Sequence, residues 1–125
     1  MPEEIATKMK ANVIGTINIL ESVRQLNSCS IVVVTTDKVY ENNNYKKSFV
    51  ETDILGGSDP YSSSKAAVEL AVKSWNQSFF NTENVVVSTA RAGNVVGGGD
   101  WSKNRIVPDV ISSLIKKETL RIRYP

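Results

Sequence analysis

The sequence predicts an α/β fold in which helices connect the strands of a parallel sheet. Two observations indicate this fold. Apolar side chains recur at helical spacing in three stretches of the chain, and two β-branched runs, "IVVV" at 31–34 and "VVV" at 85–87, separate those stretches. Helix, strand, helix, strand and helix therefore alternate, which is typical of parallel strands joined by helical crossovers.

The first two predicted elements are a helix over residues 3–26 and a strand at about 30–36. In the helix, apolar or small side chains recur at spacings of three, four or seven residues: Ile5, Met9, Thr16, Leu20 and Val23. The strand is apolar for four residues before it turns polar. This pattern predicts a strand that is buried on both faces and whose carboxyl end opens into a site.

The polar, glycine-rich stretch after the first strand predicts a loop. It ends in Asp59 and Pro60, which suit the N-cap and the first position of a helix. That helix is expected over about 60–80, with one stripe of side chains on the same face: Tyr61, Lys65, Val68, Val72, Trp75 and Phe79. A second strand near 84–90, a glycine-rich loop and a last helix that begins after Pro108 complete the predicted order.

Composition excludes several classes of protein. A chain of 125 residues with 41% apolar and 22% charged residues is expected to form one globular unit. The net charge of +2 comes from scattered charges, so neither nucleic acid nor a membrane is an expected partner. The first ten residues lack the apolar core of a signal peptide and the longest aliphatic run is too short to span a bilayer, so a cytoplasmic location is expected.

The side chains present limit the chemistry. Histidine is absent and Cys29 is the only cysteine. This composition excludes Ser-His-Asp triads, Cys-His dyads, His-ligated metals, multi-cysteine zinc sites and an internal disulfide, so no metal site is expected. Any reaction must therefore use tyrosine, lysine, carboxylates and hydroxyls.

Polar side chains gather where ligands bind in a parallel α/β sheet, at the carboxyl ends of the strands. "TTDK" at 35–38 follows the first strand, Tyr61 and Lys65 occupy the first turns of the next helix, and "RAGN" at 91–94 follows the second strand. Asn12 lies on the apolar face of the first helix, where a polar side chain needs a buried partner. Each feature alone has an ordinary structural explanation, such as a strand end, a turn or a solvated lysine. Together they predict one site.

Four motifs in unbroken order resemble the extended short-chain dehydrogenase/reductases and, within them, the CDP-glucose 4,6-dehydratases: "NVIGT" at 12–16, "VVVTTDKVYE" at 32–41, "DPYSSSK" at 59–65 and "RAGNVVGGGDW" at 91–101. The Tyr-x-x-x-Lys pair and the Asn-x-x-Gly-Thr helix are general to the superfamily, whereas Thr-Asp-Lys and the last loop point to the narrower family. Thr36 stands where that family usually has serine, which keeps a hydroxyl. The resemblance implies a Rossmann-like doubly wound parallel sheet with helical crossovers.

The resemblance also implies that the chain is the middle of a longer enzyme. Residues 1–90 are expected to be the C-terminal half of the NAD-binding domain, and residues 91–125 the start of the sugar-nucleotide-binding region. No G-x-x-G-x-x-G turn between a strand and a helix occurs in the sequence, so the isolated chain is expected to bind NAD poorly and to be inactive. Relatives commonly dimerise through the helices that match residues 3–26 and 60–80, so a homodimer is expected of the full-length enzyme.

The reaction that the resemblance implies converts CDP-glucose to CDP-4-keto-6-deoxyglucose through NAD-dependent oxidation at C4, elimination of the C6 hydroxyl and return of hydride to C6. Tyr61 would take the proton of the C4 hydroxyl. The Lys65 ammonium would stabilise the phenolate, since a charge about 4 Å away is worth roughly 4 kcal/mol at an effective dielectric constant of 20. Thr36 would hydrogen-bond the C4 oxygen, Asn12 would order a proton-relay water behind Lys65, and Thr35 would join Tyr61 and Lys65 at the cofactor.

Elimination needs an acid at the leaving oxygen and a base at C5. By resemblance, Asp37 is the acid, and Lys38 takes the position where the dTDP-glucose relatives carry a glutamate base. Asn94 would contact the diphosphate of the nucleotide sugar, and Arg105 and Trp101 are further candidates for nucleotide contacts.

Two alternatives stay open at this point. One is a 4-epimerase or another dehydratase of the same superfamily that acts on a UDP or dTDP sugar. The Thr-Asp-Lys sequence argues against the epimerase, which needs no acid and base for C6. The other alternative is a non-catalytic remnant or interaction module.

Overall fold

The computed structural model describes residues 2–41, 48–80, 84–102 and 104–122. Its elements follow the predicted order: α1 (Pro2–Val23), β1 (Cys29–Thr36), the short 3-10 helix η1 (Asp37–Val39), α2 (Pro60–Ser78), β2 (Val85–Ala92) and α3 (Ile106–Lys116). The chain divides into two compact units, Met1–Gly93 and Asn94–Pro125. The first unit holds the sheet and the second holds α3. The α/β fold class is confirmed.

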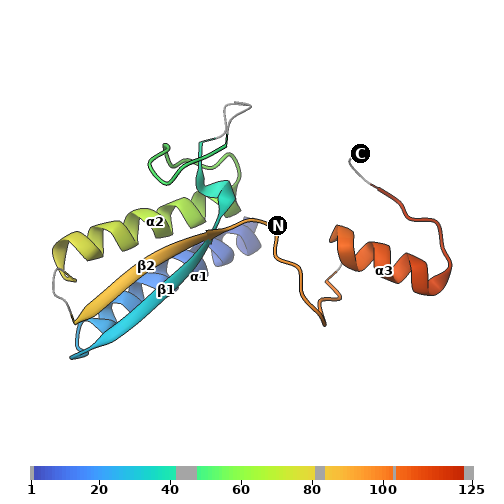
Figure 1. Cartoon of the computed structure of the whole chain (residues 1–125). Helices are drawn as coiled ribbons and strands as arrows, with labels where there is room; N and C mark the ends of the chain where they lie inside the picture. Colours follow the sequence, from blue (N-terminus) through green and yellow to red (C-terminus); the bar gives the residue numbers. More distant parts are fainter. Residues whose placement is uncertain (1, 42–47, 81–83, 103, 123–125) are drawn as a thin grey trace. The chain divides into compact units, whose positions relative to one another are not determined.

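The sheet of the first unit consists of β1 and β2, which pair in parallel. The register runs from Cys29 opposite Val85 to Thr36 opposite Ala92, so the carboxyl ends of the two strands lie at one edge. The helix α2 is the crossover between them and extends alongside both strands in Figure 1. This topology brings the residues that follow each strand to the same place.

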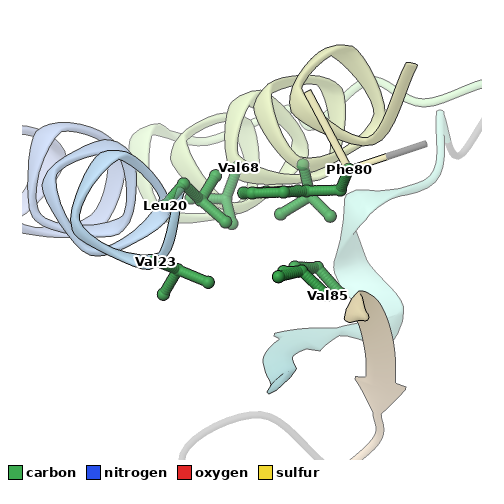
Figure 2. Packing of buried hydrophobic residues seen from close by; sticks show 7 residues of the cluster. Leu20, Val23, Val68, Phe80 and Val85 are labelled. Atoms are coloured by element: carbon green, nitrogen blue, oxygen red, sulfur yellow. The ribbon is translucent and has the colours of Figure 1, made fainter. Parts of the chain in front are cut away.

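The hydrophobic core lies between α1, α2 and one face of the sheet. Its buried members come from all three: Leu20, Val23, Val68, Val72, Phe80, Val85 and Val87. Figure 2 shows side chains from both helices and from β2 directed toward one another. Burying an aliphatic side chain of this size contributes about 1.5–3 kcal/mol, so this cluster is the main cause of the packing.

The opposite face of the sheet is uncovered within this unit. Val32 and Val34 of β1 are 64% and 59% exposed, and Val86 of β2 is 50% exposed. The expectation that the first strand is buried on both faces is therefore wrong for the described residues of this unit. The reason is that α1 and α2 both pack against the face that carries Ile31, Val33 and Val87.

The first turn of α2 is built by a capping box, as Asp59 and Pro60 predict. The Asp59 carboxylate accepts hydrogen bonds from the backbone N–H of Tyr61 at 2.8 Å and of Ser62 at 3.1 Å, and the Ser62 hydroxyl accepts from the backbone N–H of Asp59 at 3.2 Å. These bonds satisfy N–H groups that have no partner inside the helix. They fix the position from which the Tyr61 side chain extends.

In the second unit, α3 begins at Ile106 rather than after Pro108, so the predicted start is three residues late. Pro108 occupies the third helical position, where its missing N–H removes no hydrogen bond because first-turn N–H groups have no intrahelical acceptor. Lys117 ends the helix in the left-handed conformation, with φ of 57°.

Among the described residues, no helix combines the length and the apolar character that a membrane span needs.

Candidate active site

Thr36, Asp37 and Lys38 lie at the carboxyl edge of the sheet, where β1 turns into η1. The Thr36 hydroxyl caps η1 by accepting from the backbone N–H of Lys38 at 3.4 Å, and it donates to Asp37 Oδ1 at 3.1 Å. Lys38 Nζ lies 3.2 Å from the same carboxylate oxygen. A Cβ on Gly93, the residue after β2, would lie 3.7 Å from Asp37 Oδ2. The two strands therefore bring their carboxyl ends together beside Asp37.

The Asp37 carboxyl is ionised at neutral pH. Partial burial raises its pKa, but hydrogen bonds from Lys38 and Thr36 and the charge of Lys38 outweigh that effect, so the pKa lies below its usual value. The side chains of Asp37 and Lys38 are both about half exposed, and an exposed ion pair contributes little to stability. Their contact can therefore be exchanged for contacts with a ligand at little cost.

Tyr61 and Lys65 lie in the first two turns of α2, and their four-residue spacing places them on one helix face. The Tyr61 side chain is half exposed. Lys65 Nζ donates to the backbone carbonyl of Val34 in β1 at 3.2 Å. Lys65 thus extends from α2 to β1, two residues before Thr36. The predicted pair and the Thr-Asp-Lys segment share one edge of the sheet.

Asn12 of α1 has the partner that its place on an apolar helix face requires. Its Nδ2 donates to the Ser64 hydroxyl at 2.9 Å, and that hydroxyl donates to the Tyr61 carbonyl at 2.7 Å. The Asn12 carbonyl in turn accepts from Thr16 Oγ1 at 2.7 Å. Asn12 is therefore connected to the backbone of Tyr61 through a buried serine. Its suggested role in ordering a water stays a prediction.

Thr35 faces inward and takes part in a buried network that sequence reasoning missed. Its hydroxyl donates to Glu69 Oε1. Glu69 Oε2 accepts from Thr89 Oγ1 at 2.9 Å and from an Arg91 guanidinium nitrogen at 3.0 Å. The other Arg91 nitrogen donates to the Tyr40 hydroxyl at 2.9 Å. A sequence signal for Glu69 existed, because an acid four residues after Lys65 falls on the helix face that also carries Val68 and Val72.

The Glu69 carboxylate stays charged although it is buried. Burial raises its pKa. The hydrogen bonds from Arg91, Thr35 and Thr89 and the charge of Arg91 lower the pKa by more than burial raises it, so the pKa lies below its usual value. Its side chain is only 3% exposed and that of Arg91 17%. A buried charge of this kind persists only when it is paired and hydrogen-bonded, and Glu69 meets both conditions.

The candidate substrate-binding residues Asn94, Trp101 and Arg105 belong to the second unit. All three are exposed, and Arg105 lies 3.8 Å from a carboxylate oxygen of Asp100. In the first unit, Lys65 contacts β1 two residues before Thr36, Asn12 contacts Ser64 in the first turns of α2, and Thr35 is turned toward Glu69. The placement of the three residues of the second unit toward Tyr61 stays a prediction.

Two side chains at this edge offer hydrogen-bond donors to a ligand. Lys65 presents an ammonium that donates to the Val34 backbone carbonyl, and Tyr61, four residues earlier on the same helix face, presents a half-exposed phenol. An ammonium and a phenol donate hydrogen bonds to hydroxyl and carboxamide oxygen atoms. Tyr61 and Lys65 thus present donors suited to a ligand that carries hydroxyl or amide oxygens, as the riboside and carboxamide of NAD do.

Comparisons with known sequences point to one family. A family model described as the NAD dependent epimerase/dehydratase family matches residues 2–123. CDP-glucose 4,6-dehydratase of Salmonella typhimurium is 42% identical over 120 residues, which cover 91% of this chain and 33% of that protein. The chain thus spans about a third of the length of this relative.

Solved structures share the fold. The dTDP-glucose 4,6-dehydratase of Bacillus anthracis, solved with NAD, matches with a TM-score of 0.75 at 27% identity and covers 90% of this chain and 34% of its own. The UDP-glucuronic acid 4-epimerase of Bacillus cereus, solved with UDP-glucuronic acid and NAD, matches with a TM-score of 0.75 over 89% of this chain and 33% of its own. Its identity of 16% supports the fold alone.

Proposed function

The chain belongs to the NAD-dependent epimerase/dehydratase family, and from that premise we propose that it is the catalytic segment of a CDP-glucose 4,6-dehydratase. The observation that carries the proposal is the hydrogen-bonded Thr36–Asp37–Lys38 cluster at the carboxyl end of β1, which places an acid and a base side by side. The 42% identity to a CDP-glucose 4,6-dehydratase supports the choice of substrate. We further propose that residues 1–90 belong to the NAD-binding domain and residues 91–125 to the sugar-nucleotide-binding region.

Oxidation at C4 of the sugar requires that the C4 hydroxyl lose its proton, and Tyr61 is the proposed base. Lys65, anchored near the end of β1 by the Val34 carbonyl, would stabilise the resulting phenolate. Thr36 would hydrogen-bond the reacting oxygen, and Asn12 would hold the first turn of α2 through Ser64. NAD, when bound, supplies the hydride acceptor and donor for this chemistry.

Elimination of the C6 hydroxyl uses the Asp37–Lys38 pair in the proposal. In the free chain Asp37 is a carboxylate paired with an ammonium. A bound sugar would remove water from both groups, and desolvation favours the neutral forms, so a proton passes from Lys38 to Asp37. Asp37 is then the acid that protonates the leaving C6 oxygen, and Lys38 is the base that takes the C5 proton. These two proton transfers release the C6 hydroxyl as water and return Asp37 and Lys38 to their charged forms.

The experiment that tests this function is a chimera in which the chain replaces the matching third of the Salmonella enzyme. We expect the purified, folded chimera to convert CDP-glucose to its 4-keto-6-deoxy product, detected by mass spectrometry. UDP-glucose and dTDP-glucose serve as competing substrates. A folded chimera that binds NAD but converts none of these sugars would support the non-catalytic alternative, and preference for another sugar would overturn the choice of CDP-glucose.

A further inference from the structure

We propose that Glu69 and Arg91 are positioning residues: their buried ion pair holds the carboxyl ends of β1 and β2 against α2, and so sets the Thr36–Lys38 segment relative to Tyr61. This inference rests on the proposed dehydratase function. Neither residue is assigned a contact with substrate. Their effect would be exerted through the residues that they hold.

Glu69 joins α2 to both strands at neighbouring positions. Thr35 of β1 lies directly opposite Arg91 of β2 in the parallel register, and both donate to the Glu69 carboxylate. Thr89, two residues before Arg91, donates to it as well, at 2.9 Å. Both carboxylate oxygens are thus occupied, and three donors from two strands converge on one side chain of the helix. This arrangement fixes the distance between α2 and the carboxyl ends of β1 and β2.

Arg91 connects the network to two further segments, one just after η1 at Tyr40 and one before α2 at Glu51. One guanidinium nitrogen donates to the Tyr40 hydroxyl at 2.9 Å and to the Glu51 carbonyl at 3.0 Å. The guanidinium also lies over the Tyr40 ring, 4.9 Å from its centroid, and that ring stacks on Phe49 with centroids 4.7 Å apart. Arg91 therefore fixes the chain just after η1 and the loop that leads into α2.

The residues that the pair holds adjoin the proposed catalytic residues in the sequence. Thr35 immediately precedes Thr36, and Tyr40 follows Lys38 by two residues. Glu69 lies one helical turn after Lys65. Loss of the pair would therefore displace both groups at once, and a displacement of about 1 Å from a distant change can lower a rate by about a hundredfold.

A buried ion pair is weak evidence for stability, because replacing both partners with apolar residues is often neutral or stabilising. This property separates a positioning role from a stabilising one. In the chimera, we expect Glu69→Gln, Arg91→Lys and the double variant Glu69→Met/Arg91→Met to lower kcat by about a hundredfold at saturating CDP-glucose, with KM changed by a few-fold. The double variant is expected to melt close to the wild-type temperature. Glu69→Asp, which keeps the charge, should recover part of the lost kcat.

The matched control is Asn76→Ala. Asn76 also links α2 to β2, through a 2.8 Å bond from its amide to the Val87 carbonyl, but it lies in the last turns of α2, away from the proposed site. We expect this variant to melt at a lower temperature with unchanged kcat in the folded protein. If the folded Glu69 and Arg91 variants also keep the wild-type kcat, the pair has no positioning role.

Amide hydrogen exchange in the full 125-residue chain supplies a readout that does not depend on activity. Glu69→Gln should speed exchange at residues 36–41 and 50–56 by about tenfold relative to wild type, whereas Asn76→Ala should not. Equal exchange in wild type and Glu69→Gln would overturn the inference. A wild-type chimera without activity on CDP-glucose would instead contradict the proposed function, and the exchange data would still decide whether the pair holds these segments.

Discussion

Three proposed catalytic side chains at the sheet edge, those of Lys65, Asp37 and Lys38, have partners that a ligand could replace. Lys65 donates to the Val34 carbonyl, and Asp37 accepts from Lys38. The Asp37–Lys38 pair is half exposed, and exposed contacts of this kind contribute at most about 1 kcal/mol. By contrast, Glu69 is buried and is paired to Arg91, whose side chain is only 17% exposed. At the scale of single residues, exchangeable contacts mark the proposed reacting groups and buried contacts mark the support.

The roles of the reacting groups predict that their variants fail at different stages. In the chimera, Tyr61→Phe should abolish the rise in reduced-nicotinamide absorbance on mixing with CDP-glucose, because oxidation at C4 lacks its base. Asp37→Asn and Lys38→Met should still give this rise but slow its decay by about a hundredfold to ten-thousandfold, because elimination lacks an acid or a base. Single-turnover absorbance measures both phases.

The control for the lysine variant is Lys73→Met, on the exposed part of α2, which should turn over like wild type. If Lys38→Met turns over at the wild-type rate, Lys38 is not the base at C5. If Tyr61→Phe still reduces the cofactor normally, the Tyr61–Lys65 spacing carries no catalytic meaning.

The backbone conformation and the close packing at position 57 require glycine. Its φ is 122°, and a Cβ there would lie 2.5 Å from the backbone nitrogen of Ser63 and 2.6 Å from the carbonyl carbon of Ser62 in the first turn of α2. We expect Gly57→Ala to lower the free energy of unfolding by more than about 1 kcal/mol, measured by urea denaturation. Gly98→Ala is the control, because nothing lies within 4 Å of a Cβ at that position. Equal stability of the two variants would contradict the close packing of the loop on α2.

At the scale of elements, α2 organises the first unit. Its first turn is held by Asp59, its middle by Val68 and Glu69, and its last turns by Trp75, whose indole N–H donates to Glu21 of α1 at 2.8 Å. The helix thereby contacts α1, both strands and η1. A change at its N-terminus is expected to move the proposed base as well as the stability.

The N-cap of α2 predicts a pH dependence. Hydrogen bonds from the Ser62 hydroxyl and backbone N–H, with that of Tyr61, lower the pKa of the Asp59 carboxyl. A group with a lowered folded-state pKa stabilises the fold above its unfolded value, about 3.9, and loses this contribution as the pH falls through the folded-state value. We expect Asp59→Ala to lose about 0.5–2 kcal/mol at pH 7 and Asp59→Asn to lose little, because asparagine also caps helices.

The measurement is urea denaturation of wild type and both variants between pH 7 and pH 2.5. The advantage of wild type over Asp59→Ala should shrink as the pH falls below about 4. An advantage that is constant over this range would show that the charge of Asp59 does not contribute to the cap.

At the scale of the whole chain, the first unit leaves apolar surface uncovered. Val32, Val34 and Val86 lie on the face of the sheet opposite α1 and α2 and are at least half exposed. Exposed apolar patches of this kind promote association. The chain spans about a third of the length of its Salmonella relative.

We expect the isolated chain to self-associate through this face. Light scattering at increasing concentration should show species larger than 13.7 kDa, and the double variant Val32→Lys/Val86→Lys should shift the distribution toward monomer. Ser74→Lys on the exposed part of α2 adds the same charge away from the face and is the control. A wild-type chain that stays monomeric at high concentration would contradict the expectation.

Local sequence patterns determined the elements, the cap and the family of this protein. Helical spacing, β-branched runs and the Asp59–Pro60 pair act over a few residues, so they predicted the order of elements, the capping box and the approach of the Thr36–Lys38 segment to the helix that carries Tyr61. The roles of the site residues stay predictions. The predicted start of α3 is three residues late, because a proline is tolerated in the first turn of a helix as well as before it.

Only the tertiary structure decided which face of the sheet is covered and how the site is supported. An apolar run does not determine whether one or both faces of a strand will be covered. In this unit α1 and α2 both pack on the face that carries Ile31, Val33 and Val87. Glu69 receives its bonds from Thr35 and Arg91, which lie 34 and 22 residues away in the sequence. These partners depend on the register of β1 and β2 and on the distance between α2 and the two strands. No local pattern encodes those distances, because they arise only when the crossover closes and the core packs.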